Sequence, residues 1–211
     1  MTIAARKQRE KEEMKCCVLE TAMKLFLEEG FGNVSLRRIA EKIEYSPSTI
    51  YLYFKDKDEI LYALHTEGFN ELYRRQQAIP STKDPLQRIR KHGEVYIKFA
   101  LENQEYYNLM FIMRSPAKRF ENGEAWNVGL RSYEFFRKDV QAAIEAGVLR
   151  PADLDVATFS LWSLVHGIVA LILRKRCTMM DPDQLPAVAH KAFDFVMDNI
   201  EVVPKKLSRR R

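Results

Sequence analysis

The chain has 211 residues, enough for one large or two small domains, and its 46% hydrophobic content can bury a substantial core. Its 30% charged residues fit a soluble protein, and a formal net charge of +5 is compatible with nucleic-acid binding without proving it. The adjacent Cys16 and Cys17 and the distant Cys177 argue against a disulfide framework and fit reduced thiols in a cytoplasm. The first dozen residues are polar and charged, so we expect no signal peptide.

The first predicted helix runs from about residue 11 to residue 29, after a polar stretch, residues 1–10, that we expect to be disordered. Apolar residues recur in it at helical spacing, namely Met14, Val18, Ala22, Leu25 and Phe26. Gly30 ends the run. We expect this helix to pack on the segment that follows and to complete a small three-helix bundle.

Residues 35–57 predict two short helices joined by a tight turn. Ser35 can cap the first helix, and the turn falls at Glu44. Ser46 is the expected N-cap of the second helix, with Pro47 at the first helical position, where its missing N–H costs nothing.

The second of these helices keeps two inward anchors, Ile50 and Phe54, and turns hydroxyl and phenol groups outward. The outward positions are Ser48, Thr49, Tyr51, Leu52 and Tyr53. A short helix of this kind suits the major groove of DNA, where hydroxyl groups reach bases or phosphates. A surface helix-turn-helix without a ligand is the alternative interpretation, because two-helix turns are common and their sequence signal is weak.

A further helix is predicted from Asp56 to about Gln77. Asp56 and Glu59 form a D-x-x-E capping pattern, and Lys57 would lie at the N-terminus of the helix. Backbone N–H groups, the helix dipole and a lysine together make a phosphate site, and a solvated cap is the alternative interpretation. The helix is long enough to leave the first bundle and to act as a lever between two domains.

The rest of the chain is predicted to be helical. Residues 79–85, which include two prolines, form the clearest break in the chain. Further helices are expected over residues 85–102 and 106–113, from a loop at 118–123 to about residue 146, and over residues 154–175 and 183–201. No stretch shows sustained period-two alternation or hairpin dipeptides, so the predicted fold class is all-α, without strands.

The helix expected over residues 154–175 is apolar nearly all round between Val156 and Leu173. About 20 apolar residues can cross a bilayer, but four polar residues interrupt this run and the chain has no second such segment, so we expect no membrane span. We expect burial on all faces instead, one side against its own domain and the other against a partner chain. Paired with the helix over 183–201, it would form a four-helix homodimer interface. The residues assigned to this interface are Leu164, Val169, Leu173, Val188 and Phe195.

The sequence holds no catalytic pattern. G-x-S-x-G, a phosphate-binding glycine loop, H-E-x-x-H and C-x-x-C are all missing, and the four histidines are widely separated. The acidic residues lie mostly on polar helix faces, at the spacing of solvated salt links. We therefore predict that the protein is not an enzyme and uses neither a cofactor nor a metal ion.

Four pieces of sequence, in order and at fixed spacings, carry a family resemblance. They are A-x-x-L-F-x-x-x-G-F from Ala22, S-L-R-R-I-A from Ser35, S-P-S-T-I-Y-x-Y-F from Ser46 and K-D-K-D-E-I-L from Lys55. With them, about the first third of the chain resembles the DNA-binding domain of the tetracycline-repressor (TetR) family of bacterial transcription regulators. The resemblance implies that Thr49, Tyr51, Tyr53 and Lys57 contact DNA, with Ser35, Arg37 and Ser46 near the DNA backbone; Ser48 joins this set as an outward residue of the same helix.

The turn at Glu44 and a six-residue motif in the second half of the chain also bear on the resemblance. The family usually has glycine in the turn where this chain has Glu44, which is mildly strained if the turn requires a positive φ there. The hexapeptide from Trp162 to Gly167 resembles the Trp-x-x-x-His-Gly (WHG) motif of one group of TetR C-terminal domains. His166 in this motif can donate to a ligand or titrate, and a hydrogen-bonded core histidine is the alternative. Gly167 predicts a close helix crossing or space for a ligand.

The resemblance also implies an effector pocket among the aromatic and methionine residues of the second domain. Such side chains suit an apolar cavity with a few polar groups, and ordinary core packing is the alternative for any one of them. The assigned residues are Tyr96, Phe99, Tyr107, Met110, Met113, Phe136, Trp162 and His166.

The predicted organisation has four parts: a helix-turn-helix DNA-binding domain with an N-terminal arm (1–57), a connecting helix (58–78), a helical effector-binding and dimerisation domain (79–203) and a basic tail (204–211). The resemblance implies a cytoplasmic homodimer, usually a repressor, that binds a palindromic double-stranded DNA operator and is released by a small apolar effector. The alternative is a helical small-molecule-binding or scaffolding protein without DNA binding. Glu44 keeps that alternative open, and the retained tyrosines and Lys57 argue against it.

Overall fold

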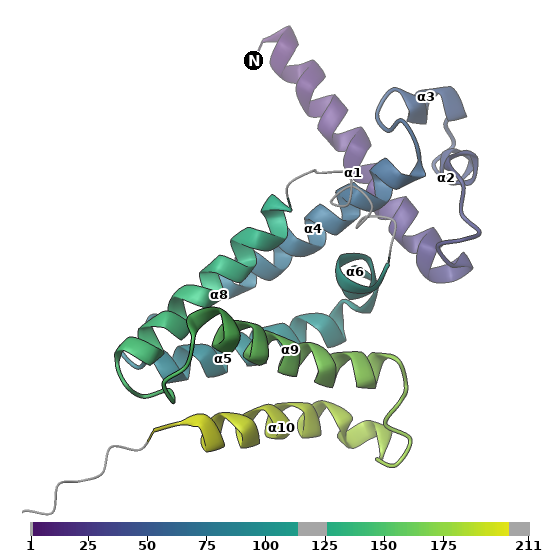
Figure 1. The fold of residues 1–211 in the computed structure, drawn as a ribbon. Coiled ribbons are helices and arrows are strands. Elements are labelled where there is room, and N and C mark those ends of the chain that lie inside the picture. Colours follow the sequence, from purple (N-terminus) through teal and green to yellow (C-terminus); the bar gives the residue numbers. More distant parts are fainter. Residues whose placement is uncertain (1, 114–125, 203–211) are drawn as a thin grey trace, which may run out of the picture. The chain divides into compact units, whose positions relative to one another are not determined.

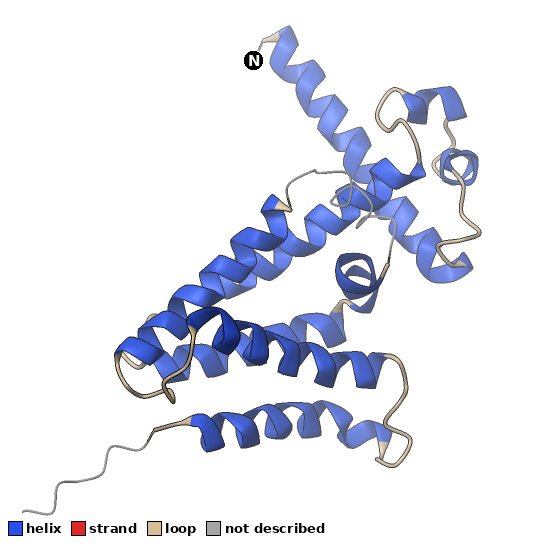
Figure 2. Cartoon of the chain, viewed as in Figure 1, coloured by secondary structure: helices blue, strands red, loops and turns tan. Residues whose placement is uncertain are grey.

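The structure is a computed structural model that describes residues 2–113 and 126–202. These residues form helices and loops, with no strand among them and with one isolated antiparallel bridge between Leu149 and Glu201 (Figure 2). The all-α prediction is therefore confirmed for this part of the chain. The loop expected at 118–123 and the basic tail lie outside the described residues.

The chain forms two compact units. The first runs to Gly68 and includes the segment that begins at Glu105, and the second runs from Phe69 to Gln104 and resumes at Trp126. The boundary falls within one continuous helix, α4 (Lys57–Gln77) (Figure 1). This division differs from the expected one, because Leu109 packs into the core of the first unit.

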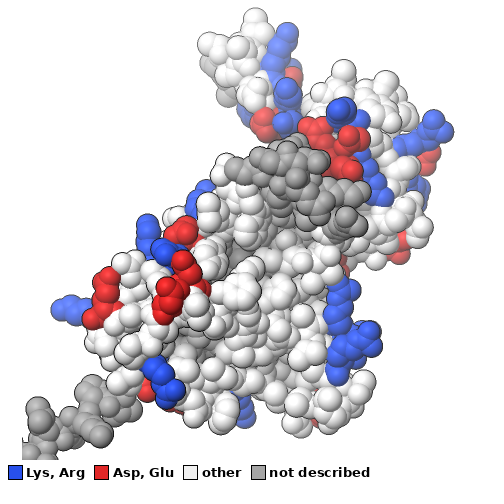
Figure 3. Space-filling model, in the orientation of Figure 1, with Lys and Arg blue, Asp and Glu red and all other residues white. Residues whose placement is uncertain are grey.

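The helices of the first unit, besides the first part of α4, are α1 (Ile3–Glu29), α2 (Leu36–Lys42), α3 (Pro47–Tyr51), α6 (Gln104–Tyr107) and the π-helix η1 (Asn108–Ile112). The expectation of disorder over residues 1–10 is wrong, since α1 already begins at Ile3. Side-chain pairs four residues apart support this exposed stretch, including Arg6 with Glu10 at 2.7 Å and Arg9 with Glu13 at 3.3 Å. Figure 3 shows the resulting mixture of basic and acidic side chains along this part of α1.

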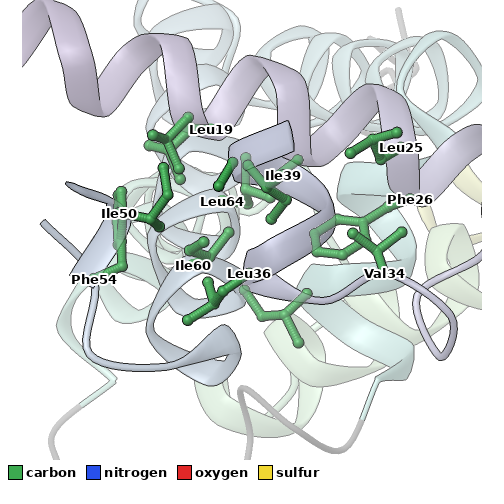
Figure 4. Close-up of a cluster of buried hydrophobic side chains, with 14 of the residues drawn as sticks. Leu19, Leu25, Phe26, Val34, Leu36, Ile39, Ile50, Phe54, Ile60 and Leu64 are labelled. Atoms are coloured by element: carbon green, nitrogen blue, oxygen red, sulfur yellow. The ribbon is translucent and has the colours of Figure 1, made fainter. Parts of the chain in front are cut away.

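The core of the first unit is built from α1, α2, α3 and α4 (Figure 4). Its fully buried side chains are Val18, Ala22, Leu25, Ile39, Ala40, Ile50 and Ile60. Several of these are the periodic positions expected from the sequence. The expected stripe of α1 is confirmed, although Met14 packs at its margin and is only partly buried.

The second unit contains the rest of α4 with α5 (Pro85–Glu102), α8 (Asn127–Glu145), α9 (Leu154–Leu173), the short 3₁₀-helix η2 (Pro182–Gln184) and α10 (Leu185–Ile200). Helix α5 packs against α8, α9 and α10. Its crossing with α10 requires glycine, because a Cβ atom on Gly93 would lie 2.2 Å from the ring of Phe193. This close approach fixes where α10 lies along α5.

A partly buried ion network joins α5 to α8. The guanidinium of Arg88 donates to both carboxylate oxygens of Asp139, at 2.7 and 3.0 Å, and His92 Nε2 lies 2.8 Å from Asp139 Oδ2. Burial raises the pKa of the Asp139 carboxyl, but the hydrogen bonds from His92 and Arg88 outweigh it, so the pKa lies below its usual value. The carboxylate therefore stays ionised and holds the two helices together.

Helix α9 has an exposed side with large apolar residues, and α10 exposes one large aromatic side chain. Val156, Phe159 and Leu171 of α9 and Phe195 of α10 are exposed, Phe195 to 70%. Within the described residues, α9 is the one helix long and apolar enough to cross a membrane, and only 22% of its most apolar window is buried within the chain. The inner side of α9 is covered by its own unit as expected, and cover of the outer side by a partner chain stays a prediction.

His65 of α4 is a buried histidine in the first unit, 1% exposed, with its ring stacked on that of Tyr62 at 5.7 Å between centroids. Burial lowers the pKa of His65 to about 4. The unfolded chain binds a proton near pH 6.5, whereas the folded chain does so only near pH 4. The stability that this neutral histidine contributes is therefore present above pH 6.5 and lost as the pH falls from there toward 4.

We predict that the free energy of unfolding falls by about 3 kcal/mol between pH 7 and pH 4 on account of this one group. His65→Gln should remove that part of the loss, because glutamine does not titrate. Urea unfolding followed by circular dichroism at several pH values measures how the free energy of unfolding depends on pH in the original protein and in the variant. An equal decline in both proteins would contradict the assignment of the pH dependence to His65.

Candidate nucleic-acid interface

Helix α2 is fixed at its start by two side chains. Ser35 Oγ accepts a hydrogen bond from the N–H of Arg38 at 3.2 Å, so Ser35 is the N-cap that the sequence predicts. The guanidinium of Arg38 donates to Glu29 of α1 at 2.8 and 3.0 Å. These contacts hold α2 against α1 and leave Arg37 exposed to solvent.

The turn after α2 has the backbone of a Schellman motif, with glutamate where glycine is usual. The N–H of Tyr45 donates to the carbonyl of Ala40 at 3.0 Å, and the N–H of Glu44 donates to that of Glu41 at 3.2 Å. Glu44 has φ = 60°, the left-handed conformation that disfavours a side chain. The condition under which the sequence predicts mild strain at Glu44 is thus met, and the turn closes in spite of it.

Helix α3 is a single short element held by its cap and by two apolar anchors. Ser46 Oγ accepts from the N–H of Thr49 at 3.3 Å and lies within hydrogen-bonding distance of the hydroxyl groups of Ser48 (2.7 Å) and Thr49 (2.9 Å). Ile50 is fully buried and Phe54 nearly so. The anchors expected from the sequence are confirmed, and they determine which side chains face outward.

The residues assigned to DNA differ in how far they reach solvent. Ser35, Arg37, Ser46, Ser48 and Tyr51 are exposed, whereas Thr49, Tyr53 and Lys57 are partly buried. Tyr53 packs against the core of the first unit, which limits its outward reach. The set is therefore brought together on one unit, but not all of it is free to contact a ligand.

Lys57 has a structural role that the sequence did not indicate. Its ammonium group donates to the carbonyl of Phe31 and lies 5.7 Å from the centroid of the Phe26 ring. Burial lowers the pKa of Lys57. An ammonium group has three donors, so this contact leaves N–H groups for a phosphate while tying the loop after α1 to the start of α4.

A shallow groove of about 490 Å³ connects these elements. It is lined by Val34, Ser35, Leu36, Arg37, Tyr51, Lys55, Asp56 and Lys57. The acidic lining residue is used in a helix cap, since Asp56 Oδ1 accepts from the N–H of Glu59 at 2.8 Å and Glu59 in turn accepts from the N–H of Lys55 at 2.6 Å. The groove thus presents three cations with an exposed phenol, which suits a phosphate backbone. Sequence reasoning missed Lys55, whose signal was its place beside the capping pattern.

The residues assigned to an effector pocket are divided between the two units. Tyr96, Trp162 and His166 come together in the second unit, with Tyr96 Oη 2.9 Å from His166 Nδ1 and the rings of Trp162 and His166 at 5.9 Å. Burial lowers the pKa of His166, which favours the neutral ring. Phe99 is fully buried, and Phe136 packs on His92 at 5.3 Å. The remaining three, Tyr107, Met110 and Met113, belong to the first unit.

The residues assigned to a dimer interface are partly corrected. Val169 is fully buried within its own chain, so its assignment to the interface is wrong. Leu164, Leu173 and Val188 are half-buried, and Phe195 is exposed. Val156, Phe159 and Leu171, which the sequence analysis did not assign to the interface, lie on the exposed face of α9. A Cβ atom on Gly167 would meet no atom of residues 2–113 or 126–202 within 4 Å, so no close crossing among these residues explains this glycine.

The capped, anchored pair α2 and α3 beside a cationic groove defines a helix-turn-helix protein. A model of the N-terminal domain of bacterial regulatory proteins of the tetR family matches residues 18–64, and a model of tetracyclin repressor-like C-terminal domains matches residues 89–199. The chain belongs to the TetR family. The predicted membership of the family is thereby confirmed.

Curated relatives are distant. The HTH-type regulator YuxN of Bacillus subtilis is 28% identical over 102 residues, which cover 48% of this chain and 34% of YuxN. HbdR of Aromatoleum is 22% identical over 163 residues, 74% of this chain and 69% of HbdR. The chain therefore matches only about a third of YuxN along its length.

Solved structures share the fold. A TetR/AcrR regulator of Thermobifida fusca has a TM-score of 0.67 at 22% identity, covering 94% of this chain and all of that one. The fatty acid degradation regulator FadR of Bacillus halodurans has a TM-score of 0.70 at 16% identity, covering 87% of this chain and 94% of FadR. At these identities the likeness establishes the fold.

We predict that Glu44→Gly raises the free energy of unfolding by about 1 kcal/mol, because glycine removes the Cβ strain of the left-handed conformation. Glu41→Gly, three residues earlier within α2, should instead lower it by about 1 kcal/mol, because glycine disfavours a helix. Chemical denaturation of both variants measures the difference. Destabilisation by both changes would show that the side chain of Glu44 contributes more than its backbone strain costs.

Proposed function

We propose that this protein is a ligand-responsive transcription regulator that binds a palindromic DNA operator as a homodimer. It acts as a repressor, and a small apolar effector releases it from the operator. The observation that carries the proposal is the cationic groove beside the exposed side of α3. Arg37, Lys55 and Lys57 supply positive charge at the edge of a helix whose inner side is fixed by buried anchors. In this arrangement phosphate contacts position the short helix in the major groove.

The exposed apolar face of α9 and α10 supports the homodimer. Val156, Phe159, Leu171 and Phe195 would leave water if the same face of a second copy covered them, as a two-fold axis permits. To bind a palindromic operator, the two recognition helices of such a pair would have to lie about 34–36 Å apart, the spacing of successive major grooves. A second copy therefore accounts for both the apolar face and the palindromic operator. We also propose a cytoplasmic location, in which protein and not lipid covers α9.

The cluster of Tyr96, Trp162 and His166 supports an effector site in the second unit. It joins an indole and a phenol to a ring that burial keeps neutral, the mixture of apolar surface and few polar groups that small-molecule sites use. The same cluster contains the first and fifth residues of the hexapeptide motif, and we propose that the C-terminal domain belongs to the WHG group. Gly167 leaves space beside this motif.

Coupling between effector and operator would run along α4. This helix contributes buried Ile60 and Leu64 to the first unit, and in the second unit its Gln76 accepts a hydrogen bond from Ser132 at 2.7 Å. A ligand that favours one position of α4 would thereby change the separation of the two recognition helices in a dimer. Effector and DNA must then weaken each other's binding by the same factor.

The proposal is tested by incubating the purified full-length protein with fragments of genomic DNA at two salt concentrations and sequencing what it retains. We expect one palindrome to be enriched and its binding to weaken steeply with salt. Arg37→Gln and Lys55→Gln should each reduce the affinity by about tenfold and the slope of log affinity against log salt by about 2 per dimer, since each removes one phosphate contact per protomer. Fluorescence anisotropy on the enriched sequence measures both quantities.

Lys24→Gln is the matched control, because Lys24 is an exposed lysine of α1 that does not line the groove. It makes the same change of charge and should alter the affinity little. An equal loss for all three variants would mean that net charge, and not the groove, drives binding. Retention of DNA without an enriched sequence, or no retention at either salt concentration, would contradict the regulator proposal.

We predict that Phe159→Asp and Phe195→Asp convert the dimer to a monomer, because each buries a charge in the interface, while far-UV circular dichroism stays unchanged. Both side chains are more than half exposed within the chain, so the folded monomer tolerates the change. Leu130→Asp, at an exposed apolar position of α8, is the control and should leave the dimer intact. Light scattering after size exclusion measures the mass. A dimer that survives both substitutions would place the interface elsewhere.

A further inference from the structure

One aliphatic side chain stands out on the recognition segment. Leu52, the C-cap residue of α3, is 76% exposed, and its neighbour Tyr51 is 58% exposed. Exposed leucines occur singly on many surfaces, and Leu27 of α1 is one in this unit. The position of Leu52 differs from that of Leu27, because Tyr51 beside it lines the cationic groove.

The backbone around Leu52 is held in place, so its exposure does not arise from a loose chain end. The N–H of Leu52 donates to the carbonyl of Thr49 at 3.2 Å, and the N–H groups of Tyr53 and Phe54 both donate to the carbonyl of Ile50, at 2.9 and 3.0 Å. Ile50 and Phe54 are buried on either side of it in the sequence. The leucine side chain is therefore presented outward from a rigid turn.

We propose that Leu52 is a specificity-determining residue that reads the C5 methyl group of a thymine in the major groove. The inference rests on the operator binding proposed above. A leucine side chain neither donates nor accepts hydrogen bonds, so it cannot read the polar edge of a base. Among the four bases, thymine alone presents an apolar group in the major groove, its C5 methyl. Charge complementarity selects DNA as the occupant, since Arg37, Lys55 and Lys57 line the groove that adjoins Tyr51.

The consequence is a preference that depends on one methyl group. Cytosine at the same position lacks the methyl group. A C·G pair also differs from a T·A pair in its hydrogen-bonding groups, but leucine makes no hydrogen bonds with them. Deoxyuridine pairs like thymidine and differs from it only by this methyl group. Replacing thymine by uracil therefore isolates the contact from every hydrogen bond at that base pair.

The experiment uses the full-length protein and the operator selected from the genomic fragments. Each thymine of a half-site is replaced by deoxyuridine, one position at a time and symmetrically in both half-sites, and the affinity is measured by anisotropy. We expect one position at which the substitution weakens binding about fifteenfold, which is about fourfold per half-site and corresponds to about 0.8 kcal/mol for each lost methyl contact.

Leu52→Ala should bind the thymine operator as weakly as the original protein binds the uracil operator, and it should bind both operators equally. Leu27→Ala is the matched control and should keep the full preference for thymine. Uniform affinity across the uracil series for the original protein, or a preference that survives Leu52→Ala, would overturn the assignment while leaving the regulator proposal in place. Failure to enrich any sequence would overturn both.

Discussion

The burial of Ile50 and Phe54 is the constraint on which the rest of the first unit depends. A helix of five residues has too few hydrogen bonds to be stable by itself, so α3 exists because these two side chains insert into the core formed by α1, α2 and α4. Once Ile50 and Phe54 are buried, the side chains of Tyr51 and Leu52 point toward solvent, because they lie on other sides of the same turn. The outward chemistry of the site is thus a consequence of inward packing.

The polar contacts around the site serve mainly to provide hydrogen-bond partners for backbone groups. The cap at Ser35, the Schellman turn at Glu44, and the caps that Asp56 and Glu59 provide to the N–H groups of Glu59 and Lys55 satisfy N–H or C=O groups that helix ends leave open. Lys57 has the same role, because its ammonium group donates a hydrogen bond to the carbonyl of Phe31. Its role in the fold and its role in the groove are therefore linked, and a change at Lys57 would affect both.

The second unit is stabilised differently. An ionised Asp139 between Arg88 and His92 joins two helices inside the unit, whereas α9 leaves an apolar face uncovered. Burying that face against an identical copy would give the protein its two-fold symmetry. Dimerisation and DNA recognition are then connected, because a palindromic operator needs two recognition helices at a set distance.

The sequence alone determined where most helices lie, the caps at Ser35, Ser46 and Asp56, and the inner face of the DNA-binding bundle, because apolar periodicity and capping residues act locally. It failed to indicate that α1 extends to Ile3, although the charged pairs four residues apart were visible in it. Only the tertiary structure decided which side of α9 faces outward. That helix is apolar nearly all round and its sequence carries no rotational signal, so packing on α5 and α10 buried Val169 and left Phe159 exposed. Tertiary packing likewise brought Lys55 into the groove and assigned Tyr107 and Met110 to the first unit, because contacts between residues distant in sequence depend on how helices cross.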